Sequence, residues 1–215
     1  MKKQNKSFYT AIMFLVSFTV WTILLKYVDL KPIGPDNSTV GFATINGYFH
    51  RLTGTNMTLY TITDWLGLVP IFVVLFFGVI GLAEWIKRKS ILKVDFGILT
   101  LGVFYIVVML VYILFEKVVI NYRPVLINGY LEVSYPSSTT LLCMCVMPTA
   151  IIQFKRLIKS KFLSQSVTFA IVTFTAFMVI GRLLSGVHWL SDIIGGILLS
   201  AGLVTMYYSI NKSKF

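Results

Sequence analysis

The stretch Met178–Gly196, MVIGRLLSGVHWLSDIIGG, interrupts a long apolar run with three ionisable side chains. Arg182 stands at the end of one membrane-length segment, and His188 and Asp192 stand at the start of the next. A charged side chain in a membrane-spanning segment is costly, so it is usually retained for a function. The stretch therefore predicts two adjacent spans whose ends carry a functional site.

The composition of the whole chain predicts an integral membrane protein. Of the 215 residues, 57% are hydrophobic and only 13% are charged, whereas about 25% of the residues of soluble domains are charged. A soluble fold of this composition would need a larger core than a chain of this length can enclose. We expect a single transmembrane domain over residues 1–215.

Six apolar runs are long enough to cross about 30 Å of hydrocarbon as helices. The runs are continuous rather than alternating, and lipid offers no partner to unpaired backbone groups, so helices are favoured over a barrel. The expected fold class is all-α, a polytopic membrane protein with six transmembrane helices. The predicted spans are Phe8–Val28, Trp65–Ile86, Phe96–Phe115, Ser138–Phe154, Ser164–Leu184 and Trp189–Ile210.

The distribution of basic residues predicts the orientation. The net charge of +11 could suggest a nucleic-acid partner. However, 13 of the 19 basic residues lie in the two tails and in alternate connections, which is the positive-inside pattern. We therefore expect cytoplasmic N- and C-termini, a multi-pass protein of the cell membrane and no nucleic-acid partner. These residues are Lys2, Lys3, Lys6, Lys87, Arg88, Lys89, Lys93, Lys155, Arg156, Lys159, Lys161, Lys212 and Lys214.

The first outside connection, Asp29–Asp64, is long. It contains FATINGYFHRLTG, which could form an amphipathic helix at the membrane interface. His50 and Arg51 within it match no motif, and we interpret them as a helix surface that faces lipid headgroups. Asp64 and Trp65 are interpreted as a helix cap and an interfacial anchor.

The second and third outside connections carry groups suited to an anion. The segment SYPSSTT leads directly into the fourth span, and a proline followed by Ser137 and Ser138 favours a helix start. The free N–H groups of such a start bind anions. Arg123 in the second connection and Arg182 in the third could neutralise the oxygens of a phosphoryl group.

His188 and Asp192 are spaced for a coupled pair. Positions i and i+4 of a helix share one face, so Asp192 could accept a hydrogen bond from one ring nitrogen of His188. That bond would fix the tautomer and leave the other nitrogen free to act as a nucleophile.

Three ordered motifs make the chain resemble the phosphatidic acid phosphatase type 2 superfamily of membrane phosphatases. That family carries K-x6-R-P, then P-S-G-H, then S-R-x5-H-x3-D. The third motif is matched by GRLLSGVHWLSD, with Gly181 in place of the serine. The first is matched by EKVVINYRP, but Glu116 occupies the lysine position and Lys117 comes one residue later. The second is matched by PSST, with Ser138 in place of glycine and Thr139 in place of histidine.

The resemblance implies a phosphatase that acts on a membrane lipid at the outer leaflet. In the family the third-motif histidine forms a phosphohistidine, which gives His188 the role of nucleophile and Asp192 the role of orienting it. No metal or cofactor is expected, because the sequence offers no cluster of carboxylates or histidines. The expected catalytic residues are Arg123, Arg182, His188 and Asp192, and the expected substrate-binding residues are Lys117, Ser137, Ser138 and Thr139.

The departures from the motifs affect the expected substrate. In the family the second-motif histidine protonates the leaving oxygen, and Thr139 cannot do so near neutral pH. Loss of a general acid typically costs about 10²–10⁴-fold in rate. An alkoxide leaving group needs the proton, whereas a phosphate that leaves from a pyrophosphate does not. We therefore expect lipid pyrophosphates to be favoured, such as a polyprenyl (for example undecaprenyl) pyrophosphate.

Two alternatives remain open from the sequence. Lys117 would reach the phosphate only if the end of its helix were rotated or bulged, because a one-residue shift turns a helical side chain by about 100°. The chain could instead be a catalytically impaired lipid-phosphate binder or transporter, a reading that Thr139 and Glu116 favour.

Overall fold

The structure is a computed structural model that describes residues 2–212, with side chains from residue 6 onward. Over these residues the regular elements are helices, and the connections contain only isolated antiparallel bridges. The α-helices are α1 (Lys2–Tyr27), α2 (Ala43–Thr53), α3 (Met57–Leu66), α4 (Leu68–Arg88), α5 (Phe96–Lys117), α6 (Ser138–Leu157), α7 (Lys161–Leu184) and α8 (Leu190–Asn211). Two short 3-10 helices, Pro35–Asn37 and Ile91–Lys93, lie in connections.

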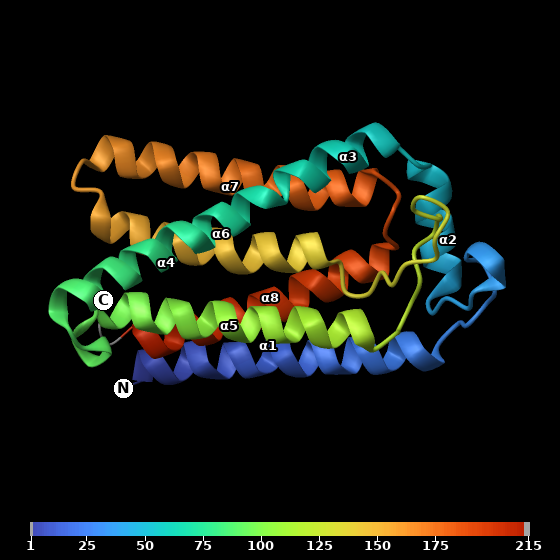
Figure 1. The fold of residues 1–215 in the computed structure, drawn as a ribbon. Helices are drawn as coiled ribbons and strands as arrows, with labels where there is room; N and C mark the ends of the chain where they lie inside the picture. The colour runs from blue at the N-terminus through green and yellow to red at the C-terminus, as the bar shows by residue number, and fades with distance from the viewer. Residues whose placement is uncertain (1, 213–215) are drawn as a thin grey trace.

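The expected all-α fold with six membrane-length helices is confirmed. The six candidate spans lie within a few residues of the predicted ones, except at the start of the second. Helices α6 and α8 lie at the centre of the bundle. In their apolar segments 50% and 44% of the residues are buried inside the protein, compared with 11% to 28% in the other spans. Figure 1 shows α1 running alongside α8, with α4, α5 and α7 around α6.

Helix α3 extends the second span beyond the predicted start. The sequence placed residues 57–64 in an outside connection, but in the structure α3 continues into α4 through Gly67 as a 32-residue candidate span, Met57–Arg88. The threonines of α3 do not interrupt the helix, because their hydroxyls donate to carbonyls one turn back. The Thr63 hydroxyl donates to the Leu59 carbonyl in this way, at 2.9 Å.

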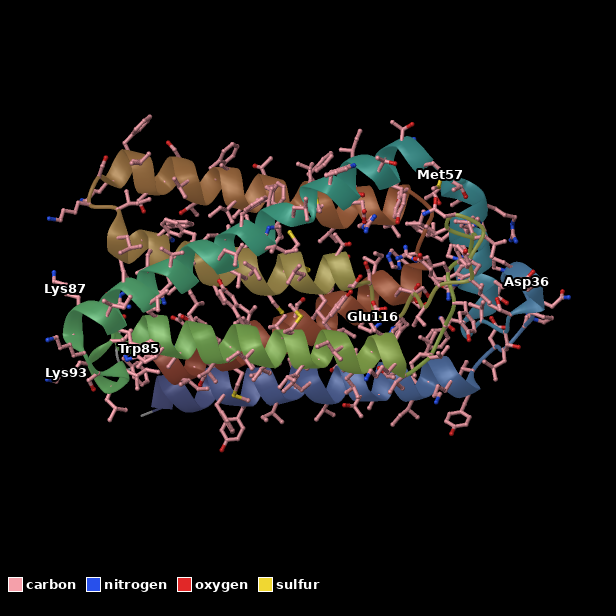
Figure 2. All side chains as sticks on the ribbon, viewed as in Figure 1. Asp36, Met57, Trp85, Lys87, Lys93 and Glu116 are labelled. Carbon is pink, nitrogen blue, oxygen red and sulfur yellow. The ribbon has the colours of Figure 1, made fainter. Side chains whose placement is uncertain are left out.

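One end of the bundle holds both chain termini and exposed lysines, and the other end holds the long first connection. Helix α1 begins and α8 ends at the same end, where Lys87 and Lys93 also project (Figures 1 and 2). The opposite end holds α2, the 3-10 helix with Asp36 and the start of α3 at Met57. This separation agrees with the charge pattern of the sequence. The orientation of the bundle in a membrane stays a prediction.

A buried tyrosine fixes the connection between α5 and α6 against the central helix. Tyr135 is 1% exposed, and its hydroxyl lies 2.7 Å from the Thr22 hydroxyl of α1. A Cβ on Gly195 of α8 would lie 2.5 Å from the Tyr135 ring, so only glycine permits this approach. The contact holds the residues just before α6 beside the first turns of α8.

Candidate active site

The predicted nucleophile lies in the connection between α7 and α8, at the end of the bundle opposite the chain termini (Figure 1). His188 precedes the first residue of α8, Leu190, so the expectation that it shares a helix face with Asp192 is wrong. The connection still brings the two side chains together, with His188 Nδ1 3.7 Å from Asp192 Oδ2. Both residues are buried.

Asp192 is held in part by the backbone of its own helix start. Its Oδ2 accepts the Trp189 N–H at 3.0 Å, which caps α8. The carboxylate therefore faces the His188 ring from a fixed position, but at a longer distance than a hydrogen bond. His188 Nδ1 has no hydrogen-bond partner.

The other ring nitrogen of His188 faces an arginine. His188 Nε2 lies 3.4 Å from Arg123 Nη1. Burial of the imidazole, and then the charges of Arg123 and Arg182, hold the pKa of His188 well below its ordinary value of 6.5. The imidazole is therefore neutral near pH 7, with one nitrogen toward a carboxylate and the other toward a cation.

A buried polar network that the sequence analysis missed supports Asp192. Its Oδ1 lies 3.5 Å from both Asn121 Nδ2 and Ser191 Oγ. Asn46 of α2 donates to Ser191 Oγ at 2.9 Å and accepts the Ser191 N–H at 3.0 Å. Asn46 is 0% exposed, so α2 is tied to the start of α8 through this side chain.

Arg123 is paired with a carboxylate from its own connection. Its Nε lies 3.0 Å from Glu132 Oε2, and its backbone N–H donates to the Glu132 carbonyl at 2.9 Å. The Arg123 guanidinium also lies 5.9 Å from the centroid of the Tyr60 ring of α3. These contacts place the guanidinium beside His188.

Arg182 lies at a junction between α3, α6 and α7. Its Nη2 donates to Asp64 Oδ1 at 2.9 Å and to Thr139 Oγ1 at 2.6 Å. Its guanidinium lies 4.9 Å from the centroid of the Tyr60 ring, so Tyr60 contacts both site arginines. The interpretation of Asp64 as a helix cap is wrong: Asp64 lies within α3 and forms an ion pair with Arg182, whereas Asn56 caps the helix.

Helix α6 starts where the sequence predicts, but the predicted capping hydrogen bond to a serine side chain is absent at this helix start. Ser137 is the N-cap residue, yet its hydroxyl makes no capping bond and is buried without a partner. Its N–H donates to the Asp192 carbonyl at 3.1 Å. Arg182 Nε is also buried without a partner. Unpaired buried polar atoms are rare in folded proteins and call for an explanation such as a functional role.

The first-motif residues separate at the end of α5. Lys117 is the last residue of α5 and is exposed. Glu116, which occupies the motif lysine position, lines a small cavity with Tyr112 and Ser138. The contacts of the described residues link six of the eight predicted site residues. Ser138 lies between two of them in the chain, and Lys117 is left outside.

His50 and Arg51 differ in their surroundings. His50 is half-buried, with Nε2 3.1 Å from the Gly186 carbonyl and its ring 5.5 Å from the Trp189 ring. Arg51 is exposed. The interpretation of both as a surface that faces headgroups is therefore wrong for His50, which packs on the connection that carries His188.

A larger cavity opens beside Arg182. Its volume is about 350 Å³, and Asp64, Ser138 and Thr139 form its polar end. The remaining wall is mostly apolar and comes from α4, α5 and α6. The apolar residues are Leu68, Ile71, Val108, Met109, Leu141 and Leu142.

Comparison with known proteins supports the resemblance. Comparison with curated proteins gives no match. Among solved structures, the chain is similar to a transmembrane PAP2 type phosphatidylglycerolphosphate phosphatase from Bacillus subtilis, with a TM-score of 0.59, 16% identity and 96% of each chain covered. At this identity the likeness shows the fold. The sequence profile described as the PAP2 superfamily matches residues 98–215, more than half of the chain. The chain therefore belongs to the PAP2 superfamily.

Proposed function

We propose that the chain is a membrane phosphatase that hydrolyses lipid phosphates or pyrophosphates through a phosphohistidine at His188, as one domain over residues 1–215. The observation that carries the proposal is the placement of the neutral His188 ring, with Nδ1 3.7 Å from Asp192 and Nε2 3.4 Å from Arg123. A neutral imidazole with a free nitrogen beside a cation can attack a phosphorus atom that the cation holds.

The phosphate would lie between the two arginines and the start of α6. Arg123 and Arg182 supply charge-assisted hydrogen bonds, and the first-turn N–H groups of α6 add donors at the positive end of the helix dipole. The unpaired hydroxyl of Ser137 and the Thr139 hydroxyl, which accepts a hydrogen bond from Arg182, both belong to this helix start. Such donors stabilise the charge that develops on the phosphoryl oxygens in the transition state.

The reaction takes two steps. His188 Nε2 forms a bond to phosphorus while the bond from phosphorus to the lipid oxygen breaks. The positive charge that appears on the imidazole is stabilised by Asp192 on its other side. Water then attacks the phosphohistidine, inorganic phosphate leaves and the neutral imidazole is restored.

The apolar cavity supports a lipid substrate. Its polar end is formed by residues that contact or neighbour Arg182, and its apolar wall can take a hydrocarbon chain. It shares Met109 with a second, mostly apolar cavity of about 610 Å³ between α4 and α5. A chain longer than one cavity could therefore extend along the groove between these helices.

Thr139 supports a preference for lipid pyrophosphates, of which polyprenyl pyrophosphate is the favoured candidate. A phosphate leaves from a pyrophosphate without a proton, so the absent motif histidine is least costly for this substrate. With cytoplasmic termini, the site at the opposite end of the bundle faces the outside of the cell membrane.

A lipid-phosphate binder or transporter is the second candidate. The observation that favours it is the pairing of both site arginines with carboxylates, Arg123 with Glu132 at 3.0 Å and Arg182 with Asp64 at 2.9 Å. A phosphate must compete with these carboxylates, which lowers its affinity and the charge left to stabilise a transition state.

Phosphate release by the purified protein in detergent separates the two candidates. Phosphatidic acid, phosphatidylglycerophosphate and a polyprenyl pyrophosphate are the substrates, and His188→Ala is the control variant, with folding checked by thermal unfolding. Release that is lost in the variant, and fastest from the pyrophosphate, is the expected result. Binding of these lipids without release, by a folded wild-type protein, would support the binder instead.

A further inference from the structure

A carboxylate outside the three motifs lies where the leaving oxygen must be protonated. We propose that Asp64 donates the proton to the leaving oxygen of phosphate monoesters, an inference that rests on the proposed phosphatase function. Asp64 comes from α3, which precedes the matched part of the family profile. Asp64 would supply the proton that Thr139 cannot donate to the leaving oxygen.

The geometry places Asp64 beside the motif position. Arg182 Nη2 donates to both Asp64 Oδ1 and Thr139 Oγ1, at 2.9 Å and 2.6 Å. The two oxygens therefore share one donor atom, and the Asp64 carboxylate lies next to the side chain that replaces the motif histidine.

The lining of the larger cavity indicates which carboxylate would face the lipid. The leaving oxygen joins phosphorus to the lipid, so it must lie where the phosphate site meets the apolar cavity. Asp64 is the one acidic side chain in the lining of that cavity, among the described residues. Glu132 forms an ion pair with Arg123. Glu116 lines only the small cavity, which adjoins the larger one because both are lined by Tyr112 and Ser138.

Substrate binding releases Asp64 from Arg182. A phosphate dianion that binds Arg182 takes the donor that now pairs with Asp64. The released side chain then lies beside the leaving oxygen, to which it passes a proton that comes from water. The Asp64 side chain is 56% exposed, so water can deliver it.

The proton transfers balance over the two steps. As the phosphorus–oxygen bond to the lipid breaks, its electron pair goes to the lipid oxygen, which takes the proton from the Asp64 carboxyl group and leaves as an alcohol. In the second step water attacks the phosphohistidine and releases its proton to solvent, and the exposed Asp64 carboxylate regains its own proton from solvent. A pyrophosphate substrate needs no proton in the first step.

The test compares leaving groups in Asp64→Asn, which keeps an oxygen for Arg182 but has no proton to donate at neutral pH. With phosphatidic acid, kcat is expected to fall about 10²–10⁴-fold. With p-nitrophenyl phosphate and farnesyl pyrophosphate, whose leaving groups are stable anions, kcat is expected to stay within about threefold of wild type.

The matched control is Glu132→Gln, which neutralises the carboxylate on the other site arginine. It is expected to change kcat/KM for all three substrates by the same factor. An equal loss for all three in Asp64→Asn would overturn the proposal, because Asp64 would then only position Arg182. A selective loss of phosphatidic acid turnover in Glu116→Gln and not in Asp64→Asn would also overturn it. Absence of His188-dependent release by the wild type would instead defeat the proposed function, and this inference with it.

Discussion

Arg182 and Asp64 form an ion pair, 2.9 Å from Nη2 to Oδ1, that joins the end of α7 to α3. The Arg182 side chain is 2% exposed and the Asp64 side chain is 56% exposed, so one partner is buried and the other reaches the opening of the site. A ligand that enters from the Asp64 side meets the carboxylate first. In the proposed phosphatase the pair would therefore set both the charge of the phosphate site and the access to it.

Arg182→Lys is expected to lower kcat about 10²–10³-fold, the usual cost of one lost donor to a transition-state oxygen. One ammonium cannot reproduce the planar guanidinium, whose Nη1 donates to Thr63 while its Nη2 donates to Asp64 and Thr139. Steady-state kinetics on a lipid pyrophosphate measure the loss. The control is Arg51→Lys at an exposed arginine outside the site, where wild-type kinetics are expected. Full activity in Arg182→Lys would contradict the proposed role of the planar Arg182 guanidinium.

In an Asp64→Asn background, Thr139→His is expected to increase phosphatidic acid turnover at least about tenfold relative to pyrophosphate turnover, because it restores a proton donor. The side chain faces the 350 Å³ cavity, so a larger ring has room there. The ratio of kcat values for the two substrates is the measurement. Thr139→Ser is the control and should leave this ratio unchanged. An unchanged ratio in Thr139→His would show that leaving-group protonation does not limit the monoester.

The sequence predicts the six spans well because long apolar runs are a local property that each span carries by itself. It predicts less well where a helix is defined by its neighbours. Helix α3 mixes threonines with apolar residues, and its burial depends on α7, which contacts Thr63 through Arg182 at 3.4 Å. The local pattern of α3 contains no sign of that contact.

The candidate site likewise contains residues that the sequence predicts and residues that it does not. Arg123, Arg182, His188 and Asp192 could be proposed together because their spacing follows a family pattern, although 65 positions separate Arg123 from His188. Asn46 and Asp64 match no pattern, and each acts through a partner more than one hundred positions away. A single sequence shows such a residue only as a polar side chain in a connection or at a helix end.

Asn46→Ala is expected to destabilise the protein by about 1–3 kcal/mol, because it leaves buried groups of Gly41 and Ser191 without partners. It should also lower kcat more than it changes KM, since Asn46 acts on Asp192 through Ser191 and contacts neither of the arginines proposed to bind the phosphate. Thermal unfolding and steady-state kinetics test the two effects. Gln165→Ala, at an exposed position of helix α7 outside the network, is the control. A stable variant with normal kcat would contradict the network.

The low pKa of His188 predicts how stability depends on pH. In the unfolded chain the imidazole binds a proton near its ordinary pKa of 6.5, whereas the folded protein keeps the ring neutral to lower pH. The unfolded state therefore binds more protons as the pH falls below 6.5, and the folded protein loses stability there. Burial also lowers the pKa of His50, so the two contributions must be separated with variants.

His188→Gln is expected to remove part of this loss. Melting temperatures between pH 7.5 and pH 5 should fall less steeply in the variant than in the wild type, because glutamine does not titrate. His50→Gln is the comparison, and it should remove the part of the stability loss at low pH that is due to His50. Identical pH dependence in wild type and His188→Gln would contradict the neutral buried imidazole.

The orientation in the membrane is testable with single cysteines, because the native Cys143 and Cys145 are 0% exposed and should react little. Tyr130, 73% exposed, lies between α5 and α6 at the site end, and Leu92, 88% exposed, lies between α4 and α5 beside Lys93. The positive-inside pattern predicts that a membrane-impermeant maleimide labels Tyr130→Cys on intact cells and Leu92→Cys only after permeabilisation. The reverse result would place the candidate site in the cytoplasm, so its lipid substrate would have to come from the inner leaflet.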